Sequence, residues 1–141
     1  MQQLLALPEG FARHYRQSPL TDPWEPLYSR RTDEAVRLGF WADRAHTNSR
    51  GFVHGGLISA LADNAMGLSC GQRIEAAPGL VTVNLALSFV GVARVGQWVE
   101  VAPAVLKVGA RLCFAEASVT ADGEPCAHAT ATFSVARPPP A

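Results

Sequence analysis

One segment of the sequence has the apolar spacing of a long buried helix, and it constrains the fold more than any other feature. Between Gly55 and about Cys70, apolar residues recur at the i, i+4 and i+7 or i+8 positions that line one face of a helix. They are Leu57, Ile58, Leu61, Ala65 and Leu68. A Pro78-Gly79 break follows, and the rest of the chain alternates with the period of a strand. A chain with one such helix must bury the apolar face of that helix against a sheet.

The part of the chain after this helix has the period of two that is expected of antiparallel strands with one buried face. From Val81 to Phe89, every second residue is valine, leucine or phenylalanine, so these side chains are predicted to share one face of a strand. The segment Ala121-Asp122-Gly123 is a strong hairpin signal, and Pro103 predicts a bulge or an edge position. The predicted strands cover residues 81–89, 98–106, 112–120 and 126–135.

The segment before the helix gives more varied signals. Phe11, Ala12 and Tyr15 predict a short helix that ends before Ser18-Pro19, because a residue before proline avoids the helical conformation. Two strands are expected around a polar turn, and a polar loop then leads into the long helix. The strands are predicted over 27–31 and 34–42, the turn over 31–33 and the loop over 44–51. Together these elements predict an α+β fold in which a curved antiparallel sheet wraps one long central helix.

Length and charge narrow the classes of function. The 141 residues fit a single domain over 1–141, with a core at about 25–136 and a frayed, proline-rich tail at 137–141. Twelve Lys plus Arg and twelve Asp plus Glu give zero net charge, which argues against nucleic acid as a partner. Three cysteines without a C-x-x-C pair favour a reducing, cytoplasmic location over a zinc site or a disulfide scaffold. Neither a signal peptide nor a membrane-spanning apolar segment is expected.

The residues with the most chemical capability gather just before the long helix and on its middle turns. Gly55 and Gly56 open the helix, where unpaired N–H groups and the positive end of the helix dipole suit a developing oxyanion. Asp63 is a carboxylate in an otherwise uncharged helix. Asn48 and His54 are hydrogen-bonding groups immediately upstream. The cluster therefore combines a candidate oxyanion donor with a candidate base.

Each of these residues also has a purely structural interpretation. Gly55-Gly56 fits tight packing of a helix against a sheet, and Asn48 fits a turn. Asp63 lies about 200° around the helix from Leu61, which is also the position of a solvent-facing carboxylate. A lone His54 is more often a packed, hydrogen-bonded histidine than a catalyst. Taken singly, these residues do not assign a function.

Taken together, the same residues form a motif. The run N-x-x-G-x-x-H-G-G from Asn48 to Gly56, followed by L-A-D at 61–63, resembles the hotdog-fold acyl-CoA thioesterases. The branch that it most resembles is the phenylacetate-degradation type within the 4-hydroxybenzoyl-CoA thioesterase superfamily. The resemblance extends over residues 34–135 and includes the segments Val81–Leu85 and Ala129–Phe133. It implies a hotdog fold and the hydrolysis of an acyl-CoA thioester.

The resemblance also implies a role for each motif residue. It implies that the amide at Gly55 polarises the thioester carbonyl and that Asp63 acts as nucleophile or general base. It implies that Asn48 helps to hold the carbonyl or the attacking water, and that His54 supports the same loop. Thr82 occupies the place of a small hydroxyl residue that positions the nucleophile or the water. No metal and no separate cofactor is implied, because CoA is part of the substrate.

Further hypotheses concern the CoA and acyl portions of the substrate. Arg111, beside Lys107, lies at a strand junction where relatives often contact the CoA phosphates, and Arg50 adjoins the motif. Solvated loop cations explain all three residues equally well. Four apolar residues are candidates to line an acyl pocket: Trp41, Phe52, Val53 and Met66. Ordinary positions in the core are the stronger alternative for all four.

The spacing of two motif residues predicts the assembly. Gly55 and Asp63 are eight residues apart, which is ~12 Å along a helix and too far for one chain to bring both to one thioester. We therefore expect an active site shared between the two subunits of a homodimer. Pairing of dimers into a tetramer is a separate expectation, which goes with the resemblance and not with this spacing.

Two other classes of function stay open at this point. One is a non-catalytic hotdog module that binds acyl-CoA, and the other is a hotdog dehydratase or hydratase. The sequence contains no H-E-x-x-H motif, and its one G-x-S-x-G run, at 67–71, lies inside the predicted helix rather than at the strand-to-helix turn of a nucleophile elbow, so two common hydrolase signatures are missing. Release of free thiol from acyl-CoA thioesters separates the three possibilities.

Overall fold

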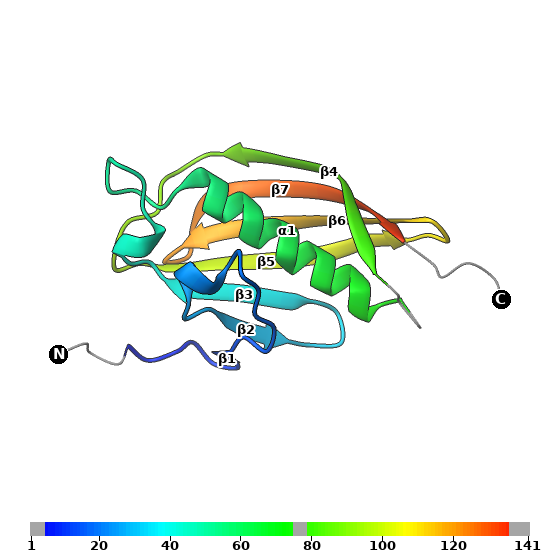
Figure 1. Cartoon of the computed structure of the whole chain (residues 1–141), viewed down its shortest axis with the longest axis horizontal. Helices are drawn as coiled ribbons and strands as arrows, with labels where there is room; N and C mark the ends of the chain where they lie inside the picture. Colours follow the sequence, from blue (N-terminus) through cyan, green and yellow to red (C-terminus); the bar gives the residue numbers. More distant parts are fainter. Residues whose placement is uncertain (1–4, 75–78, 136–141) are drawn as a thin grey trace.

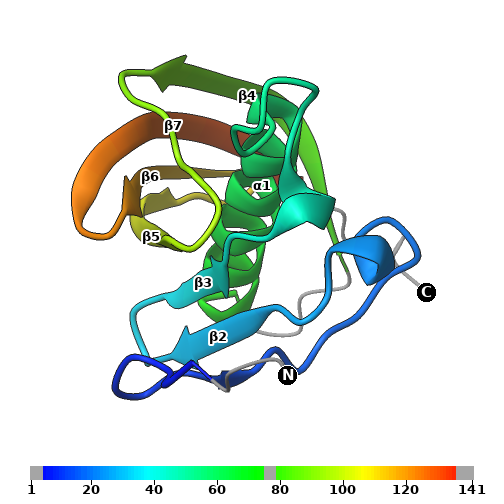
Figure 2. The ribbon, with the colours of Figure 1, turned by 90° about the vertical axis from the view of Figure 1, so that its left-hand side faces the viewer.

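A seven-stranded antiparallel sheet wraps around one long helix in the computed structural model, which describes residues 5–74 and 79–135 (Figure 1). The helix α1 (Gly55–Gln72) packs against the inner face of the sheet, and the two layers form the core (Figure 2). This arrangement confirms the predicted α+β fold. The strand order is β1-β2-β3-β5-β6-β7-β4. The elements besides α1 are β1 (Ala12–Arg13), η1 (Asp22–Trp24), β2 (Tyr28–Arg31), β3 (Val36–Trp41), η2 (Arg44–His46), β4 (Leu80–Phe89), β5 (Trp98–Val108), β6 (Leu112–Ala121) and β7 (Glu124–Val135).

The N-terminal segment is extended rather than helical, so the short helix predicted around residues 11–15 is wrong. Strand β1 occupies this place and pairs with residues 28–29 of β2. The neighbouring Phe11 ring packs edge-on against the Trp98 ring, with 5.2 Å between the ring centroids. One isolated helical turn fixes many backbone angles for a single hydrogen bond, whereas pairing with β2 satisfies the backbone directly. Tertiary contacts therefore override the local pattern here.

The helix α1 confirms the predicted helix and extends it to Gln72. Its apolar face contacts strands β3 to β7, which is why the helical periodicity of the sequence is so clear. The buried Ser69 hydroxyl donates to the Ala65 carbonyl at 2.7 Å and accepts the Val36 N–H at 2.9 Å, which ties α1 to the start of β3. The buried residues of α1 are Leu57, Ile58, Leu61, Ala62, Ala65, Met66, Ser69 and Cys70.

Strand β4 departs from strict alternation at one residue, and this departure decides which side chains face the helix. The register between β4 and β7 shifts between Thr82 and Asn84, which leaves Val83 without a partner in β7. A bulge of this kind re-aims neighbouring side chains. Thr82 consequently pairs with the buried Phe133, whereas Val83 is 60% exposed. The prediction that the apolar residues of 81–89 share one face is therefore wrong for the start of the strand, and it holds for the two leucines after the bulge, which pack on the core.

Strands β5, β6 and β7 confirm the remaining predicted strands and form the centre of the sheet. The hairpin between β6 and β7 has positive φ at Asp122 (48°) and Gly123 (83°), as a type I′ turn requires. Pro103 pairs with β6, but the pairing of β5 with β3 ends at Val101. Pro103 therefore occupies a local edge position, where its missing N–H breaks no ladder.

Three further expectations concern the chain as a whole. Pro78 of the predicted break and the predicted tail at 137–141 lie outside the described residues. Within the described ranges, no helix is long and apolar enough to cross a lipid bilayer. The three cysteines, Cys70, Cys113 and Cys126, are buried and form no disulfide.

Candidate functional site

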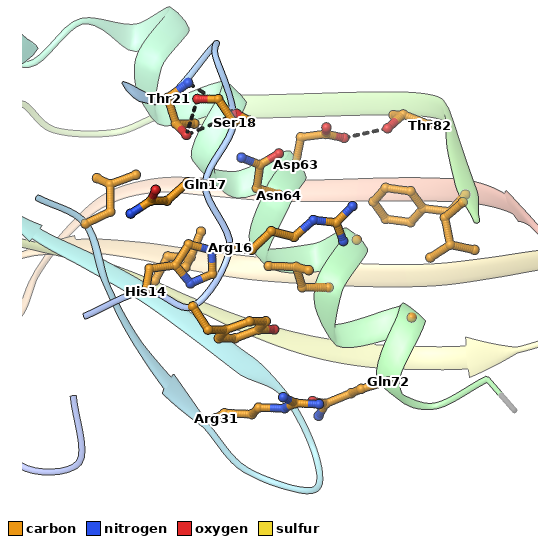
Figure 3. Close-up of a pocket in the computed structure, with 18 of the residues that line it drawn as sticks. His14, Arg16, Gln17, Ser18, Thr21, Arg31, Asp63, Asn64, Gln72 and Thr82 are labelled. Atoms are coloured by element: carbon orange, nitrogen blue, oxygen red, sulfur yellow. Dashed lines mark hydrogen bonds between the residues drawn. The ribbon is translucent and has the colours of Figure 1, made fainter. Parts of the chain in front are cut away.

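The fold brings Asp63 and Thr82 together from two elements that are 19 residues apart in the sequence. Asp63 is half-buried on the middle of α1, and Thr82 reaches it from β4 because the bulge turns Thr82 toward the helix. The Thr82 hydroxyl donates a 2.7 Å hydrogen bond to Asp63 Oδ1 (Figure 3). This hydrogen bond fixes the carboxylate orientation. Among the described residues, Asp63 Oδ2 has no hydrogen-bond partner, so this oxygen is free to accept a proton or attack an electrophile.

The start of α1 presents backbone donors rather than a carboxylate. His54 is the N-cap, and its Nδ1 accepts the Gly56 N–H at 2.8 Å, so a neutral His54 carries its proton on Nε2. The Gly55 N–H has no acceptor among the described residues. A Cβ placed on Gly55 would lie 3.3 Å from Phe89 Cζ, so the end of β4 borders this amide. The Gly55 N–H is therefore a free donor at the positive end of the helix dipole.

Asn48 closes the loop that precedes α1. Its Oδ1 accepts the N–H of Arg50 at 2.9 Å and the N–H of Phe52 at 3.2 Å, which is the turn role expected of an asparagine in a loop. The side-chain amide nitrogen has no acceptor among the described residues. Asn48 thus shapes the loop with its oxygen and retains a donor that can reach a ligand.

Two arginines share one aromatic ring beside this loop. The Arg50 guanidinium carbon lies 5.7 Å from the Phe52 ring centroid, and that of Arg94 lies 5.4 Å from the same centroid. Neither guanidinium forms an ion pair with a described residue. Sequence reasoning missed Arg94 because the bridge between Phe52 and Arg94 joins segments about 40 residues apart.

Lys107 and Arg111 lie elsewhere in the structure. They belong to the end of β5 and the turn into β6, at the edge of the molecule where α1 ends (Figure 1). Asn48, Arg50 and Gly55 lie where α1 begins. The chain by itself therefore does not bring Arg50 together with the other two predicted CoA-contacting residues, Lys107 and Arg111.

A cavity of about 630 Å³ opens beside Asp63 and Thr82. Its walls come from α1, from the start of β4 and from the N-terminal segment between His14 and Thr21. Figure 3 shows Arg16 reaching from that segment toward α1, with Arg31 and Gln72 at the end of the cavity away from Asp63. The cavity therefore begins at the candidate base and continues along the helix.

The four candidates for an acyl pocket do not line this cavity, and the preferred alternative of an ordinary core position holds for Val53 and Met66. Met66 is fully buried in the core, Val53 is 6% exposed, and Phe52 packs under the two arginines. Trp41 packs on Trp98, with 5.3 Å between the ring centroids. Apolar residues near a motif are more often needed for the core than for a pocket.

Sequence reasoning also missed the lining residues His14, Arg16, Arg31 and Gln72. The N-terminal segment carries no periodicity that predicts its position across α1, so these residues give no local signal. His14 is 7% exposed, and its Nδ1 has no hydrogen-bond partner among the described residues. Burial lowers the pKa of His14; the Glu25 carboxylate opposes this shift, and the Arg16 guanidinium adds to it. At neutral pH the His14 imidazole is therefore uncharged.

Comparison with known proteins assigns the family. Residues 50–127, more than half of the chain, match the sequence profile of the Thioesterase superfamily. The chain belongs to this superfamily. The match includes Gly55, Asp63 and Thr82, so the site described above lies within the matched region.

Individual relatives agree with this membership. PA0474 of Pseudomonas aeruginosa, which carries a provisional esterase name, is 38% identical over 131 residues, or 92% of this chain and 98% of that protein. Human acyl-coenzyme A thioesterase 13 is 36% identical over 80 residues, or 55% of each chain. Among solved structures, the N33D variant of the phenylacetic acid degradation protein PaaI from Thermus thermophilus superimposes with a TM-score of 0.75 at 20% identity, over 84% of this chain and all of that one. The chain thus has a hotdog thioesterase fold, and its relatives' names support hydrolase activity.

Proposed function

We propose that this protein is an acyl-CoA thioesterase of the phenylacetate-degradation branch. The observation that carries the proposal is the Asp63–Thr82 pair, which lies at the head of a cavity in a chain of the thioesterase superfamily. The name of human acyl-coenzyme A thioesterase 13 supports acyl-CoA as the substrate class, and the PaaI superposition supports the branch through the fold.

The proposed reaction adds one water to the thioester and gives a carboxylate and the CoA thiol. Asp63 takes a proton from the attacking water, or attacks the carbonyl carbon itself to give a mixed anhydride that water then hydrolyses, while Thr82 holds the carboxylate in place. The carbonyl oxygen gains negative charge in the tetrahedral intermediate, and the Gly55 N–H stabilises it at the positive end of α1. Collapse of the intermediate breaks the C–S bond, and the thiolate leaves without a strong general acid.

In the proposed mechanism, the distance between these two groups calls for a second subunit. Gly55 and Asp63 lie on one continuous helix, ~12 Å apart along its axis. Strand β4 is an edge strand of ten residues without a charged side chain, and it exposes Val81 and the bulged Val83. Such an edge is normally covered, because unpaired N–H and C=O groups and apolar side chains favour association. We infer that β4 of one subunit pairs with β4 of another in a homodimer.

An antiparallel β4–β4 pair centred on Ala86, with the bulged Val83 left unpaired, would complete the site. In that register Thr82 of one subunit lies opposite Phe89 of the other. Because Thr82 contacts Asp63 and Phe89 borders Gly55, the donor of one subunit comes to the carboxylate of its neighbour. Each dimer then has two equivalent sites, as a two-fold axis requires. Pairing of dimers into a tetramer stays a prediction from the resemblance.

The same register brings the cationic groups to one end of the shared site. The loop that carries Arg50 and Arg94 in one subunit would approach the sheet end that carries Lys107 and Arg111 in the other. We propose that these residues contact the CoA phosphates, because arginine pairs with phosphate oxygens in a bidentate manner. Asn48 is proposed to hold the carbonyl or the water through its free amide donor, and His54 to maintain the loop. A cytoplasmic location stays a prediction.

The test is the release of free thiol from a panel of acyl-CoA thioesters by the purified protein. We expect saturable hydrolysis by the natural sequence and near-complete loss in Asp63→Asn, with Asp33→Asn in an exposed turn as the matched control. Binding of acyl-CoA without thiol release would support the non-catalytic module instead. If the protein adds water to the acyl chain or removes water from it, and the thioester bond stays intact, the result would support the dehydratase or hydratase alternative.

A further inference from the structure

The cavity beside Asp63 has a floor of small residues along one face of α1. Gly67 and Gly71 follow Asp63 at i+4 and i+8, so the three positions form one row on the helix surface. A Cβ placed on Gly71 would meet only Leu80 Cδ1, at 3.9 Å, and one placed on Gly67 would meet only the Phe133 ring, at 3.4 Å or more. The glycines therefore leave a channel that starts at Asp63 and runs toward the C-terminal end of α1.

The opposite wall of this channel carries positive charge. Arg16 and Arg31 line it, and Asp63 is the one acidic group among its described lining residues. Arg31 Nε donates to Gln72 Oε1 at 3.4 Å, and the Arg31 guanidinium carbon lies 5.1 Å from the Tyr15 ring centroid. These contacts orient the Arg31 guanidinium at the far end of the channel. Its two terminal nitrogens, and the whole Arg16 guanidinium, have no acidic partner among the described residues.

His14 adds a polar group without a partner to the same wall. Its side chain is more than nine-tenths buried, and no described residue bonds to its Nδ1. A buried polar atom without a hydrogen bond is unfavourable, so a ligand that orders this wall and supplies polar groups is favoured over an apolar one. The wall as a whole suits an anion with several hydrogen-bond acceptors.

We propose that the channel binds an acyl group whose far end carries a second carboxylate, and that Arg31 and Arg16 recognise this carboxylate. The inference rests on the proposed thioesterase function, because it takes Asp63 as the point where the thioester is attacked. Guanidinium and carboxylate form two parallel, charge-assisted hydrogen bonds, and the fixed fork of Arg31 is oriented to make them. An unsubstituted alkyl chain would displace water from the same polar wall without replacing the hydrogen bonds of that water, which is unfavourable.

The length of the channel sets the length of the acyl group. Gln72, which holds Arg31, lies nine residues beyond Asp63 and therefore ~13.5 Å along the helix axis. An extended chain advances ~1.2 Å per bond, and a hydrogen bond to the guanidinium occupies ~3 Å. An acyl group of about eight carbons spans the remainder. Suberyl-CoA is therefore the matched probe, and octanoyl-CoA is its counterpart without the terminal charge.

The experiment compares kcat/KM for free-thiol release from these two substrates. We expect the natural sequence to favour suberyl-CoA by about tenfold or more, as charge-assisted hydrogen bonds allow. The double variant Arg16→Gln, Arg31→Gln is expected to bring this ratio to about one. Arg30→Gln is the matched control, because Arg30 adjoins Arg31 on β2 without lining the channel, and it should retain the natural ratio.

A second variant tests the path of the chain without removing charge. Gly71→Leu places a side chain over the floor ~12 Å beyond Asp63. It is expected to lower the ratio of kcat/KM for suberyl-CoA over butyryl-CoA by about tenfold. Should the double arginine variant fail to fold by circular dichroism, Arg31→Lys replaces it, because lysine keeps the charge and loses the fork.

The outcomes separate this inference from the function on which it rests. If kcat/KM for octanoyl-CoA equals or exceeds that for suberyl-CoA, the second-carboxylate proposal is overturned. The proposed thioesterase function is then unaffected. A preference for suberyl-CoA that survives in the double variant assigns the recognition to other residues and also overturns it. Failure to release thiol from any acyl-CoA of the panel overturns both proposals.

Discussion

The start and the middle of α1 carry opposite chemical groups on one helix. At the start, Gly55 offers a backbone N–H without an acceptor among the described residues, and the surrounding loop is polar and partly exposed. In the middle, Asp63 offers a carboxylate oxygen that is oriented by Thr82 and opens on a cavity. One region suits a developing oxyanion, and the other suits a proton or a carbonyl carbon. The helix that supports both also holds them apart.

In the proposed mechanism, this difference makes the chain a carrier of two half-sites rather than of one complete site. Each half is held in place by hydrogen bonds of its own, at His54 and Asn48 in one and at Thr82 in the other, so neither depends on the other for its local structure. A two-fold pairing through β4 is the arrangement that would join the halves, and it would also cover the exposed apolar edge of the sheet. Substitutions that remove one half, or the support of one half, therefore test whether both are needed.

Asp63→Asn is expected to have the largest effect. The substitution keeps the shape and the Thr82 hydrogen bond, and it removes the base or nucleophile. We expect kcat to fall by about 10²–10⁴-fold, measured as thiol release, with the oligomer and the circular dichroism spectrum unchanged. An Asp63→Asn protein that keeps a third of the natural activity would remove Asp63 from the mechanism.

Gly55→Pro deletes the donor at the start of α1. Proline is tolerated at the first helical position, and the ψ of 130° at His54 is compatible with a following proline. Loss of one oxyanion donor is expected to lower kcat by about 10²–10³-fold. Gly55→Ala keeps the N–H and adds a methyl group close to Phe89, so its smaller loss measures the steric part alone. Equal, natural-like kinetics in both variants would exclude Gly55 from the site.

Thr82→Val is expected to have the smallest effect of the three. It removes the 2.7 Å hydrogen bond to Asp63 and keeps the shape of the side chain at the bulge. We expect a loss of about tenfold in kcat, in line with one charge-assisted hydrogen bond. Thr82→Ser retains the hydroxyl and should restore most of the activity. A serine variant as impaired as the valine variant would show that packing, rather than the hydrogen bond, matters at this position.

Much of the fold could be predicted because its signals are periodic. The row of apolar residues on α1 faces a sheet on one side only, and the hairpin at Asp122-Gly123 requires positive φ at both residues. Such patterns are local, because each one reflects the geometry of a single helix or turn. The helix spacing alone is also enough to separate Gly55 from Asp63.

The parts that could not be predicted depend on contacts between distant segments. The bulge at Val83 breaks an alternation that looks continuous in the sequence, and this break is what turns Thr82 toward Asp63. The cavity wall is built by the segment around His14, whose pairing with β2 overrides a weak helical pattern. Arg94 meets Phe52 through a bridge between two loops. None of these contacts produces a periodic pattern of residues in the sequence.

The central claim is that Gly55 and Asp63 serve one thioester from two subunits, and subunit mixing tests it most directly. Asp63→Asn and Gly55→Pro proteins are unfolded together and refolded, and each variant alone is taken through the same procedure as a control. Random association makes about half of the dimers mixed, and each mixed dimer has one site with both lesions and one site with neither. Thiol release should therefore rise from near zero to about a quarter of the natural activity. A mixture that stays as inactive as its parents, with heterodimers demonstrated by mass spectrometry, would contradict the shared site.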